Sequence, residues 1–219
     1  MYYHSFGYGA WAFGWIFAVY LGALLFAFIA VCFVVALASY FICWSKKDWL
    51  CLALGLAFTL AADYFLILHD RHLIGVAVFC FAHVAYILRA ITSKRGVMPR
   101  IYFMLPVCVL GLIVVVLACF RLDGIYVVTV LYAGLFIVNI YVSARYIQRN
   151  RVLVIAGLLL FAACDICVML FNLPLHTGAP DWFRLIFPMI WVFYLPSQAL
   201  LAVSAVDFTR SLSSKSSTL

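Results

Sequence analysis

Long apolar runs alternate with short polar segments along this chain, and that pattern predicts transmembrane helices. A helix needs about 20 apolar residues to cross the hydrocarbon core of a bilayer. When the short charged segments are taken as boundaries, the sequence contains seven such runs: Trp15–Cys43, Trp49–Leu68, Leu73–Leu88, Ile101–Phe120, Ile125–Tyr146, Val152–Leu173 and Phe183–Val206. The third run is short, so we expect its helix to continue through Arg89 and Ala90, with the arginine reaching toward the headgroups.

These runs predict an all-α, polytopic membrane protein with seven transmembrane helices. We expect one transmembrane domain over residues 1–210 and a polar C-terminal tail over residues 211–219. Alternate connections between the runs together carry 11 Lys and Arg residues on one side and 3 on the other. Because cytoplasmic loops are enriched in Lys and Arg, the N-terminus is expected outside and the C-terminus in the cytoplasm.

Composition narrows the class of protein further. The chain is 69% apolar and 10% charged, with a mean hydropathy of +1.21, which excludes a soluble globular domain. The net charge is +7, but the Lys and Arg residues lie in several short segments between the apolar runs and form no single basic stretch. We therefore expect no nucleic-acid partner. The eight cysteines lie in or beside apolar runs, where cysteine acts as a small hydrophobic residue, and we expect no disulfides. The expected location is a bacterial inner membrane or a eukaryotic endomembrane, with several membrane crossings.

Two carboxyl groups, those of Asp63 and Asp165, lie inside apolar runs. The surrounding segments read G-L-A-F-T-L-A-A-D and G-L-L-L-F-A-A-C-D, so each Asp follows the Gly of a Gly-Leu pair by eight residues. An ionisable side chain at membrane depth costs about 2.5 kcal/mol or more, and such residues usually face a bundle interior and have a functional role. Asp63 and Asp165 are therefore the first candidates for a functional site.

The similarity of the second and sixth runs predicts an internal repeat of three spans, a linker span and three more spans. In the third and seventh runs, the triplet F-A-H that ends at His83 matches the triplet P-S-Q that ends at Gln198 more weakly. The two repeats would run in the same direction, related by an axis along the membrane normal. Such an axis would place Asp63 and Asp165 at matching positions around one central cavity.

The Asp pair is suited to acid–base catalysis. One carboxyl would stay protonated as a general acid while the other is ionised and acts as a base or electrostatic stabiliser. The alternative is structural, because a neutral Asp can hydrogen-bond to a neighbouring helix for about 0.6 kcal/mol. Two Asp residues at a similar depth in one sequence context favour catalysis, so we predict Asp63 and Asp165 as the catalytic residues.

Four further polar side chains are predicted to line the same pocket and bind substrate. His83 and Tyr86 are three residues apart and share a helical face. Tyr194 and Gln198 are one helical turn apart in the last run. The alternative for each of them is packing inside the bundle, which is the role expected for Asn139.

No cofactor and no metal are expected. Cys164 and Cys167 have the spacing of metal ligands, but no second pair of Cys or His residues lies near them in the sequence. All four lysines lie in loops or in the tail, which excludes a retinal Schiff base of the usual kind despite the seven predicted spans.

Four segments resemble the YhhN-like family of transmembrane proteins, which includes lysoplasmalogenases. They read GLAFTLAADYFLIL, FAHVAY, GLLLFAACDICVML and YLPSQALLAVSAVD, and they lie in the second, third, sixth and seventh runs. The resemblance implies hydrolysis of the vinyl ether bond of a lysoplasmalogen, which releases a fatty aldehyde and glycerophosphocholine or glycerophosphoethanolamine. It also implies functional roles for Asp63, His83, Asp165 and Gln198.

The chain departs from the family pattern in three ways. Ala62 and Cys164 precede the two Asp residues where the family usually has Gly and Ser. The family usually has eight spans, and its first span has no counterpart here. The family also has a Lys-Pro element in its second span, which the run Trp15–Cys43 lacks.

We therefore expect a membrane hydrolase whose partners are a lysophospholipid substrate and the surrounding membrane lipids. The Asp pair suits this reaction, because vinyl ether cleavage needs an acid to protonate the alkene and a carboxylate to stabilise the cation or activate water. Two alternatives stay open: a proton-coupled small-molecule transporter whose Asp pair carries protons, and a non-catalytic lipid-binding membrane protein. The sequence assigns no oligomeric state.

Overall fold

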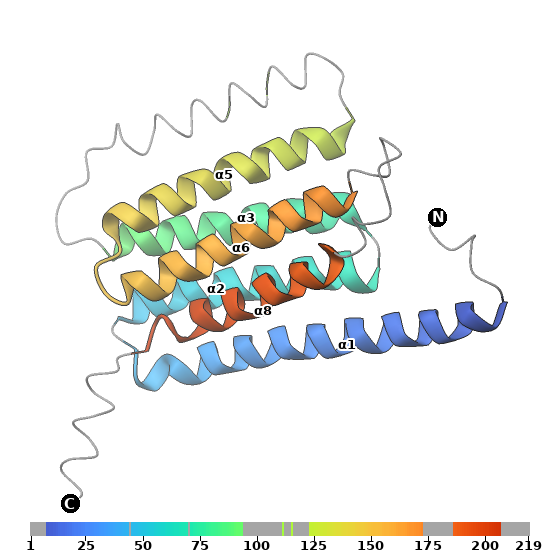
Figure 1. Ribbon diagram of the computed structural model, residues 1–219. Coiled ribbons are helices and arrows are strands. Elements are labelled where there is room, and N and C mark those ends of the chain that lie inside the picture. The colour runs from blue at the N-terminus through green and yellow to red at the C-terminus, as the bar shows by residue number, and fades with distance from the viewer. Residues whose placement is uncertain are drawn as a thin grey trace, which may run out of the picture.

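The computed structural model describes residues 8–43, 45–69, 71–93, 111, 115, 123–172 and 186–206. Its main elements are α1 (Tyr8–Ala38), α2 (Lys46–Asp63), α3 (His72–Thr92), α5 (Gly124–Tyr146), α6 (Arg151–Asn172) and α8 (Phe187–Val203). Two shorter elements extend them: the 3-10 turn η1 (Ser39–Phe41) follows α1, and the π-helical turn η2 (Tyr64–Leu68) continues α2. Figure 1 shows the long helices side by side with their axes roughly aligned.

The described part of the chain is a multi-pass helical membrane protein. It contains six helices that are long and apolar enough to cross a bilayer. Large apolar side chains, among them Leu24, Ile137, Met169 and Val192, are exposed on the outside of the bundle, as expected where lipid surrounds the protein. The predicted span Ile101–Phe120 lies outside the described residues except for residues 111 and 115, so the seventh span stays a prediction.

Among the helices that the structure describes, each contacts the next described one, and α8 returns to α1. The most extensive contacts join α2 with α3, α3 with α5, and α6 with α8. Further contacts join α1 with α2, α5 with α6, and α8 with α1, while α2 also touches α8 across the bundle. The polar side chains of α2, α3, α6 and α8 can therefore meet inside one ring of helices (Figure 1).

Close approach of α2 to α3, and of α6 to α8, depends on two glycines. A Cβ atom added at Gly55 would collide with the ring of Tyr86, and one added at Gly157 would lie 3.0 Å from Cγ of Leu201. Small residues at helix interfaces let membrane helices pack closely. Gly55 thereby leaves room for the Tyr86 side chain between α2 and α3.

The helix α3 extends beyond the predicted run and ends at Thr92. Arg89 and Ala90 belong to the helix as expected, but the Arg89 guanidinium is buried instead of reaching the headgroups. Its Nε and Nη2 donate to the two carboxylate oxygens of Asp48 at 3.0 and 3.1 Å, and its Nη1 donates to Ser204 Oγ at 2.6 Å. This bidentate ion pair with Asp48 compensates the buried charge of Arg89, so the helix α3 continues past Arg89.

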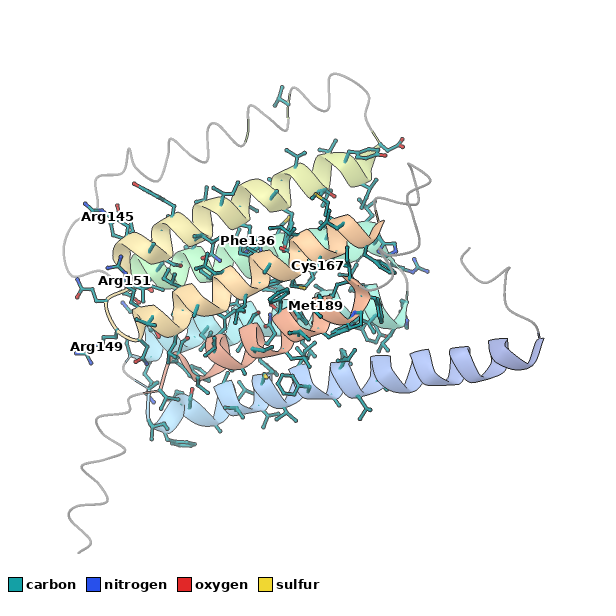
Figure 2. The ribbon with its side chains drawn as sticks, in the orientation of Figure 1. Phe136, Arg145, Arg149, Arg151, Cys167 and Met189 are labelled. Atoms are coloured by element: carbon teal, nitrogen blue, oxygen red, sulfur yellow. The ribbon has the colours of Figure 1, made fainter. Side chains whose placement is uncertain are left out.

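A second set of bonds holds the turn between α5 and α6 to the end of α8. Asn150 has a φ of 50°, a left-handed conformation that Asn tolerates better than most residues. Its side-chain amide donates to the backbone oxygens of Ser204 and Val206 at 2.9 and 2.8 Å. Figure 2 shows Arg145, Arg149 and Arg151 at this same end of the bundle, which we call the basic end.

Candidate active site

Asp63 is the last residue of α2 and its side chain is buried, at 3% exposure. The hydroxyl of Tyr194 on α8 donates a hydrogen bond to Asp63 Oδ2 at 2.6 Å. The π-helical turn Tyr64–Leu68 begins directly after this Asp. Such turns are rare and occur frequently at functional sites, but no feature of the sequence had indicated this one. The contact joins the second and last of the predicted runs.

Asp165 lies on α6 and is half-buried. The hydroxyl of Tyr132 on α5 donates to Asp165 Oδ2 at 2.6 Å. Tyr132 was not among the site residues predicted from the sequence. Its signal was weak, because it is one of 13 tyrosines, most of which also lie within the predicted apolar runs.

The two Asp–Tyr pairs have the same chemistry. In each, the hydrogen-bond donor is a neutral hydroxyl rather than a Lys or Arg side chain, so no cation fixes the charge of the carboxyl through that bond. Both tyrosines donate to Oδ2, and so neither engages Oδ1. Each carboxyl is thus held to a neighbouring helix through one of its two oxygens.

Residues of α6 link the two pairs. The buried thiol of Cys164 lies close enough to both Asp63 and Asp165 to interact electrostatically with each carboxyl group. The ring of Phe161 lies 5.4 Å from that of Tyr194, measured between ring centroids. The structure therefore brings Asp63 and Asp165 to one region inside the bundle, and neither side chain points out into lipid.

His83 on α3 is fully buried and packs beside Tyr132 of the second pair. Its ring stacks on Phe136 with a centroid distance of 4.5 Å and lies 5.0 Å from Tyr132 and 5.8 Å from Phe161. Its Nδ1 atom is 3.1 Å from the side-chain amide nitrogen of Asn139 on α5. Asn139 does bridge helices, as expected, and its partner is one of the predicted site residues.

Tyr86 and Gln198, the remaining predicted site residues, are also buried. The Tyr86 hydroxyl is 3.5 Å from Thr59 Oγ1 on α2, and the Tyr86 side chain interacts electrostatically with Asp63. The Gln198 amide nitrogen donates to Ser197 Oγ at 3.3 Å. All six predicted side chains therefore point into the protein interior rather than toward lipid.

A comparison with protein-family models matches residues 25–205 to the YhhN family. This chain belongs to the YhhN family. The matched segment includes all six predicted site residues together with Tyr132 and Asn139. No curated protein and no solved structure matches the chain.

In this YhhN chain, no group of three or more His, Cys, Asp or Glu residues is placed to hold a metal ion within the described residues. Cys164 is a buried free thiol, and Cys167 is a half-buried one. The polar side chains described in this region are two carboxyls, three tyrosine hydroxyls, an imidazole, two amides and a thiol.

Proposed function

We propose that this YhhN-family protein is a membrane hydrolase that cleaves the vinyl ether bond of lysoplasmalogens, with Asp63 and Asp165 as its catalytic residues. The observation that carries the proposal is the pair of intramembrane carboxyls, each held by a tyrosine hydroxyl at 2.6 Å and both beside Cys164. The family relationship supports the substrate class, since the YhhN-like proteins that the sequence resembles include lysoplasmalogenases.

The reaction needs the functional groups that this region contains. A protonated carboxyl adds a proton to the outer alkene carbon, which leaves an oxocarbenium ion at the carbon bonded to oxygen. Water then adds to that carbon and gives up a proton to a carboxylate, and the hemiacetal collapses to a fatty aldehyde and the free glycerol hydroxyl. One water is consumed, and the acid recovers its proton. The division between acid and base is the one used by glycosidases.

Tyr132 and Tyr194 act in this proposal as positioning residues. A hydroxyl that donates to Oδ2 limits the rotation of each carboxyl, so Oδ1 stays directed at the reacting carbon or at water. Holding reacting groups in the productive geometry lowers the entropic part of the barrier. Their bonds run between helices, from α5 to α6 and from α8 to α2, so the bundle itself sets the placement of both acids.

We also propose the predicted orientation and the parallel repeat. In the alignment that pairs Asp63 with Asp165 and His83 with Gln198, Gly55 pairs with Gly157 and Tyr86 with Leu201. Gly55 packs against Tyr86 and Gly157 packs against Leu201, so matched positions make matched contacts.

The same alignment pairs Asp48 with Asn150 and Arg89 with Ser204. Asp48 bonds to Arg89, and Asn150 bonds to Ser204, so a second set of matched positions agrees with the repeat. The gathering of Arg145, Arg149 and Arg151 at the basic end supports a cytoplasmic location for that end (Figure 2).

The test is hydrolysis of a lysoplasmalogen by the purified protein in D2O. The aldehyde product is trapped as an oxime, and its mass is measured by mass spectrometry. The proposal expects one deuterium on the carbon next to the aldehyde, because that carbon receives the catalytic proton. We expect Asp63→Asn and Asp165→Asn each to lower kcat/KM by about 100-fold or more, the usual value of a general acid or base.

Asp123→Asn serves as the matched control, since Asp123 is exposed at the start of α5, and it should hydrolyse the lipid at the wild-type rate. Full activity in both Asp63→Asn and Asp165→Asn would overturn the catalytic assignment. Proton-coupled uptake into vesicles without aldehyde release would favour the transporter instead.

A further inference from the structure

A chain of three buried polar side chains connects α5 to α3. Ser143 Oγ donates to Asn139 Oδ1 at 3.1 Å, and Asn139 Nδ2 lies 3.1 Å from His83 Nδ1. Ser143 is 1% exposed, and Asn139 and His83 are fully buried. The proposed acid–base chemistry does not use Asn139 or Ser143.

This chain determines which ring nitrogen of His83 carries the proton. The bond from Ser143 uses the amide oxygen of Asn139, so its NH2 group faces His83. An NH2 group can only donate, and His83 Nδ1 must therefore accept. A neutral imidazole that accepts at Nδ1 has its proton on Nε2.

His83 Nε2–H is then a buried hydrogen-bond donor, and no acceptor in the described part of the protein meets it. Its neighbours are the rings of Phe136, Phe161 and Tyr132. A buried donor without a partner costs about 1–3 kcal/mol, so a protein rarely keeps one unless something else supplies the acceptor. The ring of Tyr132, whose hydroxyl bonds to Asp165, lies 5.0 Å from the His83 ring, measured between centroids, so a single tyrosine separates His83 from that carboxyl.

We propose that Asn139 and Ser143 are positioning residues that fix His83 as the Nε2–H tautomer, and that this N–H donates a hydrogen bond to the free glycerol hydroxyl of the substrate. The inference rests on the proposed function and adds a substrate contact to it. His83 serves as a hydrogen-bond donor here, with no part in proton transfer.

The glycerol hydroxyl is the acceptor that the chemistry favours. The vinyl ether oxygen shares its lone pair with the alkene, which makes it a weak acceptor. The hydroxyl on the next glycerol carbon is the nearest other oxygen to the reacting bond in a lysolipid. A donor that is separated from Asp165 by the Tyr132 side chain can therefore hold this hydroxyl while the carboxyls act on the ether. A lipid that carries a second acyl chain at this position has no such hydroxyl.

The first test measures the tautomer and needs no substrate. The full-length protein is labelled with 15N-histidine, and the His83 signals are assigned by their loss in His83→Gln. We expect a pyrrole-type shift for Nε2 and a pyridine-type shift for Nδ1. In Asn139→Asp the carboxylate accepts from Nδ1–H, so the two shifts should exchange. A wild-type His83 with its proton on Nδ1 overturns the inference.

The second test measures kinetics on two substrates, lysoplasmalogen and its 2-deoxy analogue, which lacks the glycerol hydroxyl. Asn139→Asp should lower kcat/KM for lysoplasmalogen by about tenfold, the value of one hydrogen bond, mainly through KM. For the 2-deoxy analogue the variant and the wild type should react alike. An equal loss on both substrates overturns the contact with the hydroxyl.

Paired serine variants separate positioning from stability. Ser143→Ala frees the Asn139 amide to rotate and should give part of the same substrate-dependent loss, while Ser143→Thr keeps a hydroxyl and should restore activity. Ser39→Ala is the control, because Ser39 is also buried and its hydroxyl donates to the backbone oxygen of Ala36, three residues earlier in the chain. If the wild type cleaves no vinyl ether, the proposed function fails and the substrate contact with it, while the tautomer measurement still decides the role of Asn139.

Discussion

The hydroxyl of Tyr194 contributes one hydrogen bond to Asp63, and its ring packs beside Phe161. Tyr194→Phe removes the bond and keeps the ring. We expect kcat to fall by about tenfold, because the Asp63 carboxyl becomes free to rotate, while the free energy of unfolding changes by only about 0.5–1.5 kcal/mol. Single-turnover kinetics and thermal unfolding in detergent would measure the two effects separately.

Tyr141→Phe is the matched control for this substitution. Tyr141 lies on α5 and is 55% exposed, so the loss of its hydroxyl should change neither quantity. An unchanged kcat in Tyr194→Phe would show that Asp63 does not depend on this hydroxyl for its placement.

At the residue scale, charge in an apolar run was enough to single out Asp63 and Asp165, whose side chains the structure places inside the bundle. A carboxyl at membrane depth is rare enough to stand out in a single sequence. Tyr132 and Ser143 could not be found in this way, since hydroxyl-bearing residues are common in transmembrane helices. Asn139 was expected to have only a packing role. Its contact with His83 could not be foreseen, since it joins two helices whose relative rotation the sequence does not specify.

At the scale of the helices, the packing of α2 against α3 depends on the absence of a side chain at Gly55. Gly55→Ala should lower the free energy of unfolding by about 1–3 kcal/mol, since the new methyl group collides with the ring of Tyr86. In the background of Tyr86→Leu, which makes room, the same change should cost less. Thermal unfolding of the four proteins in this double-mutant cycle would measure the coupling.

Gly124→Ala provides the comparison for this cycle. A Cβ atom at Gly124 would lie 3.9 Å from Leu73, an ordinary contact, so this variant should unfold at nearly the wild-type temperature. Equal losses at Gly55 and Gly124 would contradict the dependence of this packing on Gly55.

The apolar runs predicted the positions of most described helices, but they predicted the first and last residues of those helices less well. We expected the short third helix to continue through Arg89 with its side chain reaching the headgroups, but the guanidinium pairs with Asp48, which is 41 residues away in the sequence. Only a three-dimensional contact reveals such compensation. The π-helical turn after Asp63 was likewise invisible, since the residues Tyr64–Leu68 fit a regular helix equally well.

For the whole molecule, the proposed orientation places Lys47 in the cytoplasm and His69 outside. A membrane-impermeant maleimide added to intact cells should therefore label His69→Cys and leave Lys47→Cys unlabelled until the membrane is permeabilised. Both side chains are exposed, so access and not burial decides the result. Labelling of Lys47→Cys from outside would reverse the orientation.

The class of the fold could be predicted from the sequence because apolar runs of about 20 residues rarely occur outside membrane-spanning helices. The ring of helices could not, since the runs alone do not specify which helices are neighbours. The proposed repeat relates the surroundings of Asp63 to those of Asp165, and it stays a prediction. Contacts such as that of Asp63 with Tyr194 required the folded chain.

Asp63 ends a helix of 18 residues that starts at the basic end, which puts its carboxyl about 25 Å along the axis from Lys46. That distance is most of the thickness of a bilayer core. Under the proposed function, the carboxyl then lies near the glycerol level of the distant leaflet. A lysolipid resident there would reach it by sideways diffusion, without first crossing to the other leaflet. Supplying substrate to one leaflet of sealed vesicles at a time would show this asymmetry directly.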